Sequence, residues 1–190
     1  MHLRTALLTL LLALPAAAAP EEDSAPSGLY LQPQVYLSTG WNLTQTTSGD
    51  PVEYPTRLGG GAGVGLRLGY DFTPYVGLFG SMTLGLQDAG PYAGYGAGLT
   101  LRTSMLGSAR LYARFGARVL TPVTPLVYGT GGVGAEVFPF DSLSLGLELD
   151  GAVPLASGTR RAGSSPTEWH VTANGGPVRG VFGITWYLGL

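Results

Sequence analysis

Residues 110–119 read RLYARFGARV, and this stretch decides how the chain can fold. Its apolar side chains occupy the odd positions, and they are Leu111, Ala113, Phe115, Ala117 and Val119. Its three arginines, Arg110, Arg114 and Arg118, all occupy even positions. Successive side chains of a β-strand point to opposite faces of the sheet, so this stretch predicts a strand with one oily face and one charged face.

The same period of two recurs seven more times along the chain. The apolar faces of these segments are Leu29/Leu31/Val35/Leu37/Trp41, Ala62/Val64/Leu66/Leu68/Tyr70, Val76/Leu78/Met82/Leu84/Leu86, Tyr95/Ala97/Leu99/Leu101, Val127/Val133/Ala135/Val137, Leu143/Leu145/Leu147/Leu149/Val153 and Phe182/Ile184/Trp186/Leu188/Leu190. Each segment has roughly ten residues or more, the length that a tilted strand needs to cross a bilayer. We therefore predict an all-β fold, an eight-stranded antiparallel up-and-down transmembrane β-barrel, over residues 28–190.

The charged residues distinguish a membrane barrel from a soluble one. A soluble lipocalin-like barrel keeps apolar residues inside and exposes charged ones, whereas a small membrane barrel does the reverse. Nine charged residues in the predicted strands lie opposite the apolar face, and we predict that they form a lumen charge network: Arg67, Arg102, Arg110, Arg114, Arg118, Glu136, Glu148, Asp150 and Arg179. A secreted soluble barrel is the alternative if this register is inverted.

The turns predict which of these charges meet. If the loop that follows the strand at 110–119 sets the register, Arg110 falls opposite Glu136 and Arg114 falls opposite Gly132. The next turn would place Glu148 opposite Gly132 as well, so that Arg114 and Glu148 could meet over the bare backbone. Glycines on the inner face would then leave room for long side chains from neighbouring strands.

The connections differ in length in a regular way. Tight turns at 71–74 and 139–141, and a slightly longer one at 103–109, are expected on the periplasmic side. Segments 42–57 and 156–177 are long, polar and rich in Gly, Ser, Thr and Pro, which predicts extracellular loops.

Aromatic residues near the strand ends fit the two interfaces of a membrane. We predict Trp41 and Tyr95 at the outer interface and Tyr70 and Trp186 at the periplasmic one.

The N-terminal residues indicate export. A short polar start, an apolar stretch and small residues predict a signal peptide at residues 1–18, cut after Ala18. The acidic, proline-containing residues 19–27 predict a disordered leader before the barrel at 28–190. The chain has no cysteine and one histidine beyond the signal peptide, so we predict neither a metal site nor a cofactor.

In these features the chain resembles the small outer-membrane barrels that include OmpX, OmpW and the transmembrane domain of OmpA. The resemblance covers the mature chain and lies in its pattern: a signal peptide, eight alternating strands, long loops on one side and a final strand at the terminus. The alternating residues of 180–190 look like the signal read by the barrel-assembly machinery, although the chain ends in Leu190 where that signal usually has Phe. The resemblance implies an integral protein of the bacterial outer membrane.

We therefore expect a monomeric, non-enzymatic protein of the outer membrane, embedded in its lipid, that stabilises the envelope and binds surfaces through its long external loops. The formal net charge of -2 gives no reason to expect nucleic-acid binding. Two alternatives stay open. One is a narrow pore that favours anions, because six inward Arg outnumber three inward acids. The other is a lipid-modifying enzyme that uses His170 with Ser164, Ser165 and Glu168 nearby in sequence.

Overall fold

The computed structural model describes residues 26–47, 50–122, 124–161 and 168–188, and all regular structure within them is β-strand. No helix in this part of the chain could span a membrane. The predicted signal peptide at 1–18 lies outside the described residues, as do all but the last two residues of the predicted leader at 19–27.

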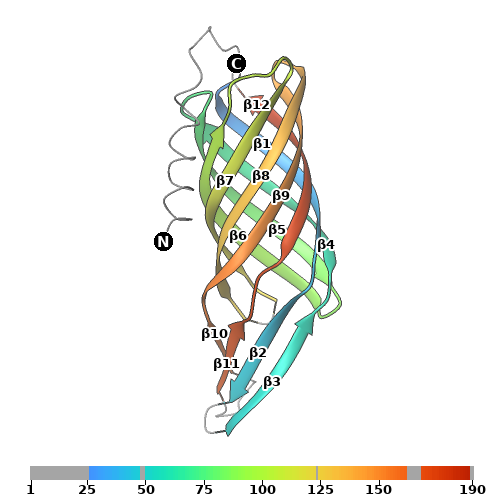
Figure 1. The fold of residues 1–190 in the computed structure, drawn as a ribbon, viewed down its shortest axis with the longest axis vertical. Helices are drawn as coiled ribbons and strands as arrows, with labels where there is room; N and C mark the ends of the chain where they lie inside the picture. The colour runs from blue at the N-terminus through green and yellow to red at the C-terminus, as the bar shows by residue number, and fades with distance from the viewer. Residues whose placement is uncertain (1–25, 48–49, 123, 162–167, 189–190) are drawn as a thin grey trace, which may run out of the picture.

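Eight antiparallel strands close into a barrel (Figure 1). They are β1 (Gly28–Ser38), β4 (Gly61–Asp71), β5 (Val76–Gln87), β6 (Gly90–Arg102), β7 (Ala109–Leu120), β8 (Leu126–Phe140), β9 (Leu143–Ala156) and β12 (Val178–Leu188). Each barrel strand pairs with the barrel strands before and after it in the chain, and β12 pairs with β1 to close the ring. The predicted all-β, eight-stranded up-and-down fold is confirmed.

The alternation in the sequence becomes an inside and an outside. On β7, Arg110, Arg114 and Arg118 are buried in the lumen, whereas Leu111 and Phe115 are 50% and 41% exposed on the outer wall. The other barrel strands repeat this pattern, so large apolar side chains cover the outer wall. Such a surface is unfavourable in water and is stabilised by contact with lipid.

The two long segments predicted as external loops instead contain strands. β2 (Trp41–Thr47), β3 (Asp50–Leu58), β10 (Gly158–Arg161) and β11 (Glu168–Ala173) form a second sheet in the order β10-β11-β2-β3. This outer sheet projects from one end of the barrel (Figure 1). Its order repeats the order β9-β12-β1-β4 in the wall, because each outer strand continues one of those barrel strands. These polar segments form strands because they hydrogen-bond to one another, which their composition alone did not indicate.

The wall bends where it passes into the outer sheet. An added Cβ at Gly40 would lie 2.4 Å from the carbonyl oxygen of Leu58, so only glycine permits the close approach of these two chains. Gly175 has a φ of 145°, which a residue with a side chain rarely adopts. Thr39 N donates to Val178 O at 2.9 Å across the bend, so backbone pairing continues through it.

Candidate functional site: the lumen network and the cluster at its mouth

The lumen holds ten charged side chains within the described residues. All nine of the predicted network lie there, and each is at most 7% exposed: Arg67, Arg102, Arg110, Arg114, Arg118, Glu136, Glu148, Asp150 and Arg179. The tenth is Asp71, which is 1% exposed and which the sequence pattern had placed in a turn. Six arginines therefore face four acids. The ten side chains form three tiers along the barrel axis.

The turn-end tier consists of Asp71, Arg102, Arg110 and Glu136. Arg102 bridges the two acids, with Nη1 2.5 Å from Asp71 Oδ1 and Nε 3.3 Å from Glu136 Oε1. Arg110 Nε donates to the same Glu136 oxygen at 2.6 Å, and Ser144 donates to the other oxygen at 2.8 Å. Two arginines balance two acids, so this tier is formally neutral.

The middle tier consists of Arg67, Arg114 and Glu148. Glu148 accepts hydrogen bonds from both arginines, with Arg67 Nη1 at 3.1 Å. Gln32 accepts from Arg67 at 2.6 Å and donates to Thr185 at 2.8 Å, so the tier is tied to β1 and β12. Buried charges are tolerated when they are paired and hydrogen-bonded in this way.

The sheet-end tier consists of Arg118, Asp150 and Arg179. Arg179 binds Asp150 through two nitrogens, at 2.9 and 2.5 Å. Arg118 donates to Asp150 Oδ2 at 3.0 Å with one nitrogen. The tier carries two positive charges and one negative charge.

The predicted register is confirmed on one side of β8 and wrong on the other. Arg110 lies opposite Glu136, and Arg114 lies opposite Gly132. Glu148, however, lies opposite Gly134 rather than Gly132. β8 continues to Phe140, so its turn to β9 lies at Asp141 and Ser142, later than the predicted turn at 139–141, and the irregularity between Val137 and Phe140 offsets one residue of that difference. The ion pair between Arg114 and Glu148 forms nevertheless, since both side chains are long enough to span the offset.

Inward glycines lie directly opposite tyrosines on the neighbouring strand. The four pairs are Tyr30–Gly69, Tyr36–Gly63, Tyr92–Gly85 and Tyr112–Gly134. A Cβ added at Gly69 would lie 2.2 Å from Tyr30 Cζ, and the other three glycines are covered in the same way by their tyrosine rings. The glycines thus make room for tyrosines that fill the lumen.

A cluster of buried apolar and aromatic side chains lies at the sheet end of the lumen, and we call it the mouth cluster. It comprises Tyr36, Trp41, Leu43, Leu58, Tyr92, Leu120, Leu126, Tyr128, Ala152, Val171, Ala173 and Val181. Leu43, Leu58 and Val171 come from the outer sheet and have no exposed surface. The inner face of the outer sheet therefore packs over the barrel mouth.

Trp41 belongs to this cluster, which differs from the interfacial position predicted for it. It is 5% exposed, and its ring meets that of Tyr92 at a centroid distance of 6.3 Å. β1 ends at Ser38 and β2 begins at Trp41. Across this break the odd-numbered side chains change from the exposed face to the buried one. Tyr70, Tyr95 and Trp186 lie on the outer wall, 50%, 54% and 43% exposed.

Tryptophan fluorescence should distinguish these positions. In single-tryptophan variants, with the other tryptophans replaced by Phe, we expect lipids with brominated acyl chains to quench Trp186 and to leave Trp41 almost unquenched. Aqueous iodide should also fail to quench Trp41, because the mouth cluster encloses it. Quenching of Trp41 by the brominated lipid would contradict its position in the cluster.

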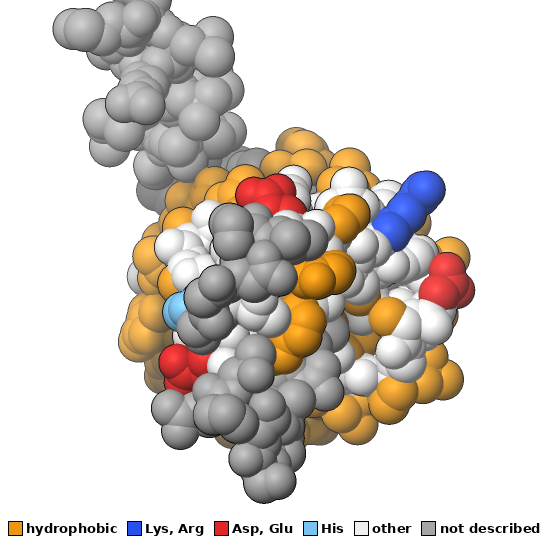
Figure 2. Space-filling view, turned by 90° about the horizontal axis from the view of Figure 1, so that it is seen from below, with side chains coloured by type: hydrophobic (Ala, Val, Ile, Leu, Met, Phe, Trp, Pro, Cys, Tyr) orange, Lys and Arg blue, Asp and Glu red, His pale blue; other side chains and the backbone are white. Residues whose placement is uncertain are grey.

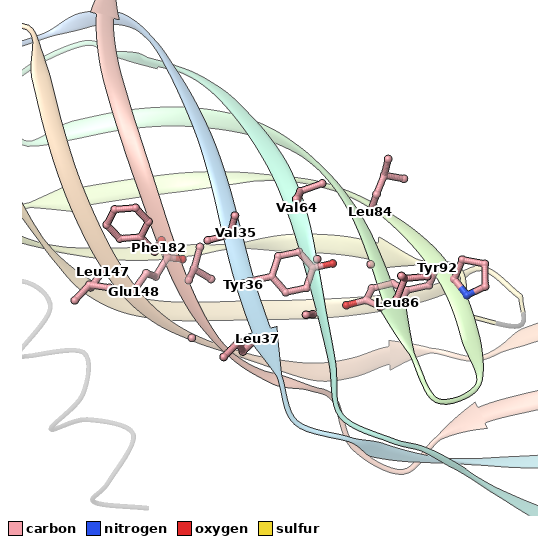
Figure 3. A pocket seen from close by; sticks show the side chains of 16 residues that line it. Val35, Tyr36, Leu37, Val64, Leu84, Leu86, Tyr92, Leu147, Glu148 and Phe182 are labelled. Carbon is pink, nitrogen blue, oxygen red and sulfur yellow. The ribbon is translucent and has the colours of Figure 1, made fainter.

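A pocket of about 980 Å³ lies beside the mouth cluster (Figure 3). Its lining includes residues of both faces of the wall. Tyr36, Tyr92 and Glu148 belong to the lumen face, and Val35 and Leu84 belong to the lipid face. It is strongly apolar, so we interpret it as a hollow in the wall that lipid chains can fill rather than as a water-filled passage.

His170 lies on β11 and is exposed. Its neighbours across the two adjoining strands are Thr46 and Thr159, and Glu168 is two residues away on the same strand. Ser164 and Ser165 lie outside the described residues. No group of three His, Cys, Asp or Glu side chains in the described ranges is arranged to hold a metal ion.

Comparison with known proteins agrees with this architecture. No curated protein sequence matches the chain. The fold is similar to the crystal structure of Neisserial surface protein A (NspA), with a TM-score of 0.53, 11% identity and coverage of 85% of this chain and 98% of that one. It is also similar to the outer membrane protein OprG from Pseudomonas aeruginosa, with a TM-score of 0.54, 8% identity and coverage of 87% and 100%. The family model for the outer membrane protein beta-barrel domain matches residues 5–184. The chain therefore belongs to the outer-membrane β-barrel family, and it is an integral protein of the outer membrane.

Proposed function

We propose that this protein is a non-enzymatic, closed barrel that stabilises the outer membrane and uses its outer sheet to bind surfaces outside the cell. The main support for this proposal is that two sets of side chains fill the lumen. Ion-paired side chains occupy its length, and the mouth cluster covers its sheet end. An eight-stranded barrel is only wide enough for its own side chains to fill the interior.

The filled lumen argues against the alternative of an anion-favouring pore. An ion would have to displace the mouth cluster and then pass three tiers of paired arginines. We expect no conductance steps when the refolded protein is added to a planar lipid bilayer in concentrated salt. A control barrel of known conductance would show that insertion occurs under the same conditions. Regular steps with anion selectivity would contradict the closed state and support the pore.

The outer sheet supports the binding part of the proposal. The face opposite the mouth cluster carries Asn42, Thr44, His170 and Thr172, of which three are exposed and Thr44 is half-buried. Figure 2 looks onto this end of the molecule, where the charged side chains of the described residues are sparse and separated. Hydroxyl, amide and imidazole groups on a rigid sheet suit hydrogen bonding to a weakly charged partner such as a neutral glycan.

Binding can be measured on whole cells. Cells that produce the protein should attach to at least one member of an array of neutral glycans, and cells with Thr44→Glu and Thr172→Glu should lose that attachment. Equivalent surface amounts of both proteins would show that the loss does not come from poor display. Retention of binding in Glu53→Gln, which removes a carboxylate from the same face, would show that the neutral groups of this face are responsible. Equal attachment by producing and non-producing cells would refute this part of the proposal.

The same proposal includes the partners of the barrel. The lipid of the outer membrane would contact the outer wall, and the barrel-assembly machinery would engage β12, whose lipid face includes Phe182 and Trp186. We propose a monomer, because a closed barrel leaves no wall strand free to pair with another copy.

A further inference from the structure

We propose that the sheet-end tier binds a small monovalent anion, such as a halide, between Arg118 and Arg179. The first observation is an imbalance of charge. The turn-end tier is neutral, but in the sheet-end tier two arginines share the single carboxylate of Asp150. The middle tier has the same excess of one positive charge, so the unused donors described next distinguish the two tiers. A buried charge without a counter-charge is strongly unfavourable in a barrel surrounded by lipid, and one monovalent anion would neutralise this tier.

The second observation is that these arginines have unused donors. Within the described residues, Arg118 Nε and Nη1 and Arg179 Nη1 have no hydrogen-bond partner. They are N–H donors, and an arginine cannot relieve the burial by losing its proton. Arg118 is 4% exposed and Arg179 is 1% exposed, so bulk water does not satisfy these donors. By contrast, the middle tier has one such nitrogen, Arg67 Nε, and the arginines of the turn-end tier have none.

The two guanidinium groups that carry the unused donors lie close together. Both guanidinium groups donate to Asp150 Oδ2, at 3.0 and 2.5 Å, so their Nη2 atoms are no more than 5.5 Å apart. Arg179 lies over the ring of Tyr36 at 4.9 Å. The hydroxyl groups of Tyr36 and Tyr92, both buried here, can rotate to donate as well. The site therefore offers an anion unused donors on two neighbouring guanidinium groups and a net positive charge.

The mouth cluster decides the size of the anion. Tyr36 and Tyr92 belong to that cluster, and the remaining members cover them toward the outer sheet. A large anion such as gluconate would have to displace packed side chains, whereas a halide needs only the space of about one water molecule. The site would hold its anion as a structural part of the folded barrel and would stabilise it by preferential binding to the folded state.

The test compares the thermal unfolding of the refolded full chain in sodium chloride, sodium bromide and sodium gluconate at equal ionic strength and pH. We expect a midpoint several degrees higher in either halide. We also expect the rise to saturate as halide replaces gluconate. Equal midpoints, or a linear rise without saturation, would overturn the proposal.

A matched pair of variants locates the effect. Arg118→Met leaves a neutral Arg179–Asp150 pair and should abolish the dependence on halide. Arg67→Met removes the same charge from the middle tier and should retain it. Retention of the dependence in Arg118→Met would overturn the proposal. If that variant does not fold, crystals of the unaltered protein soaked in bromide give a second test, with an anomalous peak expected between the two guanidinium groups and an ordered water alone contradicting the site.

Discussion

Replacing Glu148 with Gln should destabilise the folded barrel by about 3–5 kcal/mol, the range for removing one partner of a buried ion pair. Glu148 is the one carboxylate of the middle tier and accepts hydrogen bonds from Arg67, Arg114 and Tyr112. Without it, two buried guanidinium groups face each other with no counter-charge. Urea titration of the protein folded in lipid vesicles, followed by tryptophan fluorescence, measures the change.

Two further variants make this prediction specific. Glu53→Gln removes a carboxylate from an exposed position on the outer sheet and should alter the free energy of unfolding by less than about 0.5 kcal/mol. Combining Glu148→Gln with Arg114→Gln restores the net charge of the middle tier and should recover part of the lost stability. A Glu148→Gln protein as stable as the unaltered one would show that the lumen charges are hydrated rather than paired.

Replacing Gly69 with Ala should destabilise the barrel by about 1–3 kcal/mol, as is usual when a packed interior receives an extra methyl group. The new Cβ would lie 2.2 Å from Tyr30 Cζ. Tyr30 cannot easily move away, because it is fully buried and its ring packs at 5.7 Å against that of Tyr187. The midpoint of urea unfolding should fall accordingly.

Gly80→Ala is the matched control for Gly69→Ala. Gly80 lies on the neighbouring strand β5 and faces outward, and a Cβ there would meet no atom within 4 Å. We expect it to leave stability almost unchanged. Shortening the opposing side chain with Tyr30→Leu should make the Gly69→Ala change less harmful than it is alone. Equal effects of Gly69→Ala and Gly80→Ala would mean that tyrosines do not fill the space above the inward glycines.

The period of two in the sequence was sufficient to predict the barrel and nine of the ten charged side chains that the described residues place in its lumen. Each strand of the wall buries one face and exposes the other, so the charged positions opposite the oily face had to share the lumen. Short connections also made register predictable, as the pairing of Arg110 with Glu136 shows. The type of a residue and its position in a strand were therefore enough to predict most of the charged side chains that face the lumen.

Other features depend on contacts between distant segments. Pro139 belongs to β8 rather than to the turn, so the turn to β9 comes later than predicted and Glu148 lies two positions away from its predicted partner. The reversal of the buried face between Ser38 and Trp41 placed Trp41 in the mouth cluster. Asp71 seemed part of a turn because a Pro follows it closely, yet it is the last residue of β4 and pairs with Arg102. The outer sheet arises from pairing between β2 and β11, which are far apart in sequence.

The barrel presents its apolar face to lipid and keeps its arginines inside, and β7 allows this arrangement to be measured directly. The chain has no cysteine, so single Cys substitutions at Leu111, Ala113, Phe115, Ala117 and Val119 can each carry one spin label. In lipid vesicles, we predict that these labels collide frequently with oxygen, which concentrates in the bilayer, and rarely with a water-soluble nickel complex. Frequent collisions with the nickel complex at these positions, together with a protein that stays monodisperse without detergent, would instead indicate a soluble barrel with its apolar face inside.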